Sequence, residues 1–147
     1  MHTTEIRVRF GELDAYGHVN HAVYLSYFEA ARVEALTTVG FGLDRLQREG
    51  FLLVVVDLRM RFRRPAVLGD VLTVETALLE LRRASSRWTQ RILRHDEPIV
   101  TAELRGAITG PDGRPRPAPP GLADALEPLR AEVPAASAPP GRDYTRR

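Results

Sequence analysis

Hydrophobic and polar residues alternate along residues 54–63, and this is the clearest strand pattern in the chain. Valine, leucine, methionine and phenylalanine take every second position there, and valine, aspartate and arginine take the others. A period of two is typical of a strand with one buried face. Similar patterns, bounded by turn residues, predict further strands over residues 5–10, 71–81, 87–94 and 99–109, with a hairpin connection at residues 95–98.

A different period runs through residues 21–39, where apolar residues recur at three- and four-residue spacing. This pattern predicts a helix. Little polar surface is left between Tyr24 and Leu36, so we expect the helix to be largely enclosed. The run Gly40-Phe41-Gly42 should end it. Shorter helices are expected over residues 43–48 and 122–130.

The order of these elements predicts an α+β fold with a single domain over residues 1–130. One strand, one enclosed helix and then about four strands with short connections favour a five-stranded antiparallel sheet curved around a central helix. Residues 131–147 are rich in proline, alanine and arginine, which predicts a disordered tail. A single sheet of this kind has open edges, so self-association is expected.

Composition narrows the classes of function. The 147 residues include no cysteine, which excludes disulfides, thiolate metal sites and a cysteine nucleophile. The net charge of +2 does not by itself argue for a nucleic-acid partner. The first residues do not resemble a signal peptide, and no apolar run is long enough to span a membrane. We therefore expect a cytoplasmic protein that acts neither on nucleic acid nor in a membrane.

The segment from Asp14 to His21 carries the most informative chemistry, because it places a carboxylate on a turn just before the predicted helix. A helix start offers unpaired N–H groups and a positive dipole to a developing oxyanion. The carboxylate can act as a nucleophile or a general base. Asp14 can equally be a simple turn or cap residue, and Asn20 is the natural N-cap. His18 and His21 lack a further ligand at a recognisable spacing, so no metal is expected.

The same segment and the helix after it resemble the signature of hotdog-fold acyl-CoA thioesterases of the 4-hydroxybenzoyl-CoA thioesterase type. The residues that carry the resemblance are Phe10-Gly11-Glu12-Leu13-Asp14, Gly17-His18-Val19, Tyr24, Phe28-Glu29 and Arg32, with further similarity along residues 69–76 and 81–85. It covers roughly residues 5–110. It implies the hotdog fold, in which an antiparallel sheet wraps around a central helix.

The resemblance also implies roles for individual residues. Asp14 stands at the position of the catalytic carboxylate. His21 stands at the helix start, where a backbone N–H polarises the thioester carbonyl and a histidine side chain can assist. Glu29 stands where some members place a second acidic residue facing the acyl pocket. The hydroxybenzoyl enzyme has the shorter aspartate at that position.

Two further groups are expected to bind substrate. Arg82 and Arg83 match a basic pair that binds the coenzyme A phosphates, and Ser85 adds a donor beside them. An exposed solvated face is the alternative for this pair. Tyr24 is a core residue by its spacing, and it can also line the acyl channel.

The implied function is hydrolysis of acyl-CoA thioesters to a free acid and coenzyme A, with no cofactor. Two alternatives remain open, namely an acyl-carrier-protein thioesterase and a non-catalytic acyl-CoA binding module. The second would not need Asp14. The resemblance further implies a homodimer with active sites built from both chains, and dimers that join into a homotetramer.

Overall fold

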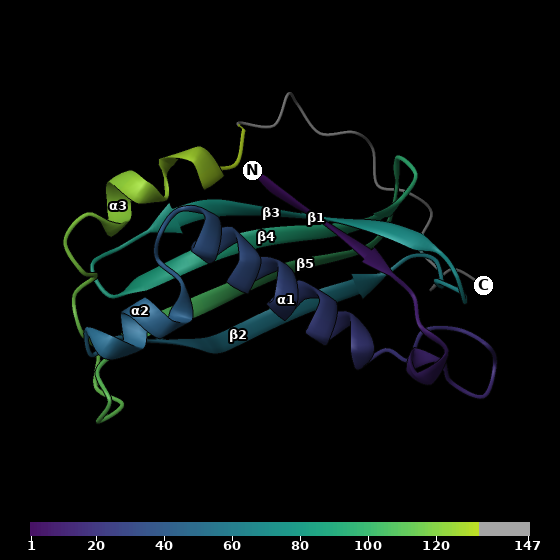
Figure 1. The fold of residues 1–147 in the computed structure, drawn as a ribbon, viewed down its shortest axis with the longest axis horizontal. Helices are drawn as coiled ribbons and strands as arrows, with labels where there is room; N and C mark the ends of the chain where they lie inside the picture. The colour runs from purple at the N-terminus through teal and green to yellow at the C-terminus, as the bar shows by residue number, and fades with distance from the viewer. Residues whose placement is uncertain (133–147) are drawn as a thin grey trace.

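The helix α1 (Val23–Thr38) lies across one face of an antiparallel sheet, as the computed structural model shows for residues 1–132 (Figure 1). The five strands follow the order β1-β3-β4-β5-β2, so β1 and β2 form the two edges. Successive hairpins join β3, β4 and β5. The expected antiparallel α+β architecture is therefore confirmed. The elements are β1 (His2–Arg7), η1 (Phe10–Glu12), α1, α2 (Leu43–Arg48), β2 (Leu52–Phe62), β3 (Val71–Leu81), β4 (Ser85–Arg94), β5 (Glu97–Thr109), α3 (Leu122–Ala125) and η2 (Glu127–Leu129).

Local patterns predicted most of these elements to within two residues, but the first strand is shifted and the helix expected over residues 122–130 is divided into α3 and η2. The ranges 43–48 and 71–81 agree with α2 and β3. In contrast β1 ends at Arg7, and Phe10 begins a short 3-10 helix with its side chain 79% exposed. The cause is a local capping interaction, because Glu12 accepts a hydrogen bond from the Arg9 N–H at 2.8 Å and turns the chain away from the sheet. The tail predicted from residue 131 falls, beyond Glu132, outside the described residues.

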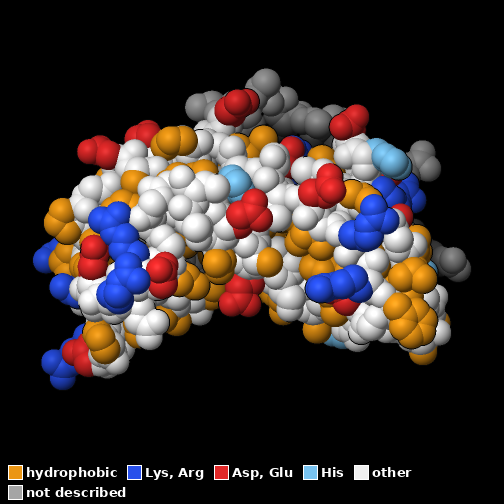
Figure 2. Space-filling view, viewed as in Figure 1, with side chains coloured by type: hydrophobic (Ala, Val, Ile, Leu, Met, Phe, Trp, Pro, Cys, Tyr) orange, Lys and Arg blue, Asp and Glu red, His pale blue; other side chains and the backbone are white. Residues whose placement is uncertain are grey.

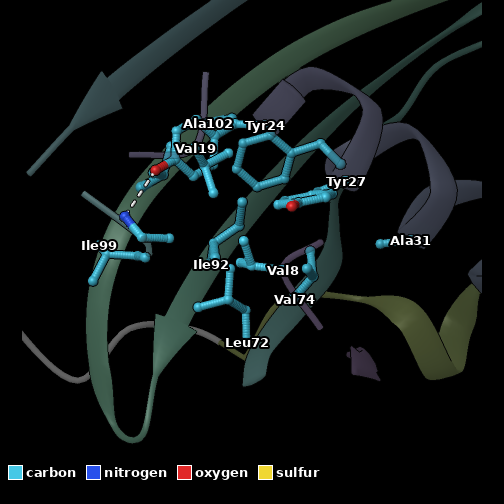
Figure 3. Packing of buried hydrophobic residues seen from close by; sticks show 13 residues of the cluster. Val8, Val19, Tyr24, Tyr27, Ala31, Leu72, Val74, Ile92, Ile99 and Ala102 are labelled. Carbon is cyan, nitrogen blue, oxygen red and sulfur yellow. Dashed lines mark hydrogen bonds between the residues drawn. The ribbon is translucent and has the colours of Figure 1, made fainter. Parts of the chain in front are cut away.

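The core lies between α1 and the sheet and divides along the helix. Beneath its N-terminal half, side chains from α1 pack against β3, β4 and β5, and Tyr24 and Tyr27 meet edge to face with ring centres 6.1 Å apart (Figure 3). Beneath its C-terminal half, Leu36 packs in a second cluster that includes Trp88 and the C-terminal residues Leu126 and Leu129. The C-terminal segment thus closes the end of the core away from Asp14.

The prediction that α1 is largely enclosed is correct for one side only. Phe28 and Ala31 are fully buried against the sheet, whereas Leu25 and Glu29 are exposed. A single sheet covers only one side of a helix, so the apolar Leu25 on the other side has nothing to pack against. None of the helices within residues 1–132 is long and apolar enough to cross a membrane.

The edge strand β2 departs from the strict alternation that its sequence suggests. Its register against β5 shifts between Val55 and Asp57. Val54, Val55 and Val56 are all exposed, as is Phe62 at the other end of the strand. Figure 2 shows that hydrophobic side chains gather along the lower margin of the molecule, on the side of β2, where the surface is hollowed. The long edge of the sheet is therefore unpaired within the chain and exposes apolar side chains toward both ends, with the exposed charges of Asp57, Arg59 and Arg61 between them.

Candidate active site

Asp14 closes the turn between η1 and α1 with its own carboxylate. Its Oδ1 accepts hydrogen bonds from the backbone N–H groups of Tyr16 at 2.8 Å and His18 at 3.1 Å. The turn requires a positive φ of 75° at Gly17, which glycine adopts without steric cost. No donor among the described residues contacts Oδ2. Hydrogen bonds to Oδ1 therefore hold the carboxylate in place, whereas Oδ2 accepts none from residues 1–132.

Glu12 links this turn to α1 through hydrogen bonds. Its carboxylate accepts hydrogen bonds from the Arg9 backbone N–H and from the buried Tyr27 hydroxyl, each at 2.8 Å, and its backbone carbonyl accepts one from the Asn20 N–H. Burial tends to raise the pKa of Glu12, but the hydrogen bonds from Arg9 and Tyr27 outweigh it, so the pKa lies below its ordinary value. Glu12 is thus an ionised support beneath the Asp14 turn.

The start of α1 presents a backbone donor next to this turn. Asn20 was predicted as the N-cap, but α1 begins at Val23 and its N-cap is Ala22, so Asn20 instead closes the turn before the helix. Its Oδ1 accepts the Ala22 N–H at 2.9 Å, and its carbonyl accepts the Val23 N–H. Among the described residues, none accepts a hydrogen bond from the His21 N–H, and His21 is exposed. This N–H lies two residues before α1 begins and is available to an oxyanion near the helix N-terminus.

Asp14, His21 and Tyr24 line one open hollow of about 400 Å³. The Tyr24 hydroxyl accepts a hydrogen bond from the Ala66 N–H at 3.0 Å, and burial raises the Tyr24 pKa. Tyr24 is therefore a core residue that also forms part of the wall. The rest of the lining comprises His18, Val19, Phe62, Arg63, Arg64 and Pro65.

Phe62 and Arg63 were not among the sequence-predicted site residues. Both residues stand at the end of the alternating pattern of residues 54–63, and nothing in that pattern indicates that β2 ends beside Asp14. The antiparallel pairing of β2 with β5 brings them there. Phe62 adds an aromatic side chain to the lining of the hollow, and Arg63 adds a cation.

Glu29 lies in a different groove, between α1, α2 and the first half of β2. Arg32, Leu53, Val55 and Trp88 line the same groove. Gln90 was not among the predicted site residues; it is buried in β4 and accepts a hydrogen bond from Arg32 Nη1 at 2.8 Å. A polar residue between Trp88 and Ile92 on an otherwise apolar strand face is a signal that could have identified it.

The predicted phosphate-binding residues lie at the opposite end of β3 from the Asp14 turn. Arg82 and Arg83 are exposed in the β3–β4 connection, and Ser85 begins β4. The Arg82 Nε donates to Glu80 Oε1 at 2.8 Å, and this hydrogen bond raises the Arg82 pKa. Within one chain the fold does not bring these residues to Asp14. Residues 1–132 contain no group of three or more His, Asp or Glu side chains that could hold a metal ion.

Comparison with known proteins connects this geometry to a family. Residues 8–126 match the family model of the thioesterase-like superfamily. The chain is 37% identical over 100 residues to the long-chain acyl-CoA thioesterase FadM of Escherichia coli, covering 68% of this chain and 75% of that protein. It is 33% identical over 118 residues to the acyl-acyl carrier protein thioesterase ATL3 of Arabidopsis thaliana, covering 79% of this chain and 61% of that protein.

Comparison of the fold with solved structures agrees with the sequence comparison. The crystal structure of a hypothetical protein, TT1821 from Thermus thermophilus, superposes with a TM-score of 0.81 at 34% identity, covering 87% of this chain and 98% of that one. The sequence match and the sheet wrapped around α1 agree with each other and confirm the resemblance drawn from the Asp14 segment. The chain belongs to the thioesterase-like superfamily of hotdog-fold proteins.

Proposed function

We propose that this protein is an enzyme that hydrolyses acyl-CoA thioesters to a free carboxylic acid and coenzyme A. The observation that carries the proposal is the hollow shared by Asp14 and His21 at the start of α1. Among residues 1–132, no donor contacts one of the Asp14 carboxylate oxygens, and the His21 N–H, just before the start of α1, has no acceptor. Thioester hydrolysis needs an attacking group and an oxyanion donor on one reacting carbonyl.

Asp14 fits either of two routes. As a nucleophile, its carboxylate attacks the thioester carbon, the thiolate leaves, and water then hydrolyses the mixed anhydride that links Asp14 to the acyl group. As a general base, it removes a proton from the attacking water, and that proton ends on the departing thiolate. In both routes the His21 N–H stabilises the oxyanion. Neither route needs a cofactor.

We further propose that two copies pair through β2 and build each active site together. The edge β1 has six residues and β2 has eleven, and β2 exposes Val54, Val55 and Val56. Long apolar edges favour pairing with another strand. A two-fold axis through β2 sets the Phe62 end of one strand against the Leu52 end of the other.

This pairing would complete the predicted site. The groove with Glu29 lies at the Leu52 end of β2, and so does the connection with Arg82 and Arg83, because β4 begins where β2 begins in the sheet register. Asp14 of one copy would then face Glu29, Arg82, Arg83 and Ser85 of the other. Assembly of dimers into a homotetramer and a cytoplasmic location remain predictions from the family resemblance.

An acyl carrier protein is the second candidate for the thiol carrier. The likeness to ATL3, which is named an acyl-acyl carrier protein thioesterase, supports it. The exposed Arg82 and Arg83 suit either the phosphates of coenzyme A or the acidic surface of a carrier protein.

The test is a panel of thioesters with short, long and aromatic acyl groups, each on coenzyme A and on a carrier protein, assayed by release of free thiol. Turnover of the coenzyme A series is the expected result. Faster turnover of the carrier-protein series would assign the protein to the second candidate. Tight binding without thiol release from any substrate would contradict hydrolysis and indicate a binding module.

A further inference from the structure

The groove that contains Glu29 has one half-buried cation in an apolar setting. Its apolar lining includes Leu36, Leu53, Trp88 and Leu104. Arg32 projects from α1 into this wall and is only partly accessible to solvent. Burial lowers the pKa of Arg32, and the nearby Glu29 carboxylate opposes that shift. A guanidinium in such a place needs hydrogen-bond acceptors, because an unpaired buried donor is costly.

Gln90 supplies one acceptor and holds the guanidinium in position. The Gln90 Nε2 donates to the Phe28 carbonyl at 3.0 Å and to the Thr76 hydroxyl at 2.8 Å. A carbonyl can only accept, so these contacts fix the orientation of the amide. The remaining amide oxygen, Oε1, accepts from Arg32 Nη1 at 2.8 Å. Arg32 is thus held by a buried residue of β4 instead of moving freely in solvent.

The other donors of Arg32 have no protein acceptor among residues 1–132. A guanidinium carries five N–H donors, and the single hydrogen bond to Gln90 uses one of them. Glu29 lines the same groove, but no hydrogen bond or ion pair joins it to Arg32 in the described part of the chain. Arg32 lines the groove together with apolar side chains, so an oxygen atom of a ligand bound there can accept from the N–H groups that Gln90 does not use.

We propose that Arg32 makes this groove select acyl groups that carry a keto or hydroxyl oxygen on an otherwise apolar chain. The inference rests on the proposed function, since it treats the groove as the acyl site. Leu36, Leu53 and Trp88 would contact the carbon chain, and Arg32 would donate to its oxygen. A neutral oxygen is favoured over a carboxylate because Glu29 stands beside Arg32 and would repel a second anion.

Binding measurements test this without relying on turnover. The probes are S-alkyl thioethers of coenzyme A, which cannot be hydrolysed. One has an unsubstituted medium chain, and the others have the same chain with a keto or hydroxyl oxygen at successive carbons. At least one oxygenated probe should bind the wild type about tenfold more tightly than the unsubstituted probe, as expected for a hydrogen bond to a charged donor.

Variants then assign the preference to Arg32. Arg32→Met should bind both kinds of probe within about twofold of each other, because it keeps the apolar stem and loses the donors. Arg32→Lys keeps a charge and a donor for Gln90, and should fold and retain part of the preference. Arg48→Met is the matched control, since Arg48 is exposed on α2 and pairs with Asp44 outside the groove; it should keep the full preference. Thermal melting checks that each variant folds.

Three outcomes would overturn the proposal. The first is equal binding of all probes by the wild type, and the second is a preference that survives in Arg32→Met. The third is loss of the oligomer in both Arg32 variants with the preference unchanged, which would make Arg32 an interface residue. Failure of the proposed function looks different. In that case the wild type would release no thiol from any thioester, and yet would still prefer the oxygenated thioethers.

Discussion

The hydroxyl of Tyr27, buried in the second turn of α1, donates a hydrogen bond of 2.8 Å to the carboxylate of Glu12. Glu12 lies two residues before Asp14, so this contact ties the turn that carries Asp14 to the central helix. The turn and the helix start carry the carboxylate and the backbone donor, respectively. Their relative position therefore depends on a buried contact between residues that are themselves outside the chemistry.

Replacement of Asp14 by asparagine should lower turnover by about a hundredfold or more, the range expected for loss of an acid-base or nucleophilic group. The amide oxygen of the variant can still accept the N–H groups of Tyr16 and His18, so the fold should survive. Steady-state thiol release measures the effect, with Asp44→Asn on the exposed face of α2 as the control. Activity close to wild type would remove Asp14 from the mechanism.

The double variant Arg82→Ala/Arg83→Ala should raise KM for acyl-CoA and have a smaller effect on a pantetheine thioester, which lacks the nucleotide phosphates. The physical reason is loss of charge-assisted hydrogen bonds to phosphate. Arg48→Ala/Arg114→Ala removes the same net charge at exposed positions elsewhere and should leave both KM values near wild type. Equal losses on the two substrates would show that Arg82 and Arg83 have a structural role.

A charge on the open edge should separate the proposed dimer. Val56 is exposed on β2 in the single chain, so Val56→Lys should leave the fold intact and prevent strand pairing. Leu79→Lys introduces the same charge at an exposed position on β3, inside the sheet, and serves as the control. Sedimentation and activity are measured on the same samples. Val56→Lys should be monomeric and inactive, and an active monomer would contradict a shared site.

Glu12→Gln should cost about 1–3 kcal/mol at neutral pH, the range for disturbing a partly buried, charge-assisted hydrogen bond. Because the folded-state pKa of Glu12 is lowered, its ionised form stabilises the fold above its ordinary pKa of 4.5, and this contribution is lost as the pH falls through the folded-state value. The stability difference between wild type and variant should therefore shrink below pH 4.5.

Urea unfolding at neutral pH and at several acidic pH values measures that difference. The control is Glu103→Gln, on the exposed surface of β5. It should change the free energy of unfolding little at any of these pH values. A difference for Glu12→Gln that stays constant with pH would mean that its ionisation does not support the turn. Thiol release by the same variant shows whether the turn must be held for catalysis.

Local patterns in the sequence were sufficient for most elements and for the most informative half of the site. The spacing of apolar residues predicted α2 and β3 to the residue, because each pattern depends on neighbours within one element. Asp14 and His21, which the sequence suggests as catalytic residues, line one hollow in the structure, and only seven positions separate them; their catalytic role stays a prediction. The first strand was misplaced because the capping contact of Glu12 overrode an alternation that continues to Phe10.

The sequence by itself thus determined the period of each element, the family, and the place of the carboxylate before the helix. Only the tertiary structure decided which residues from distant parts of the sequence come into contact. Arg32 and Gln90 are 58 positions apart, and Phe62 reaches the Asp14 hollow from the far end of β2. Such contacts depend on strand order and register, which arise from packing the whole chain at once and which no local pattern encodes.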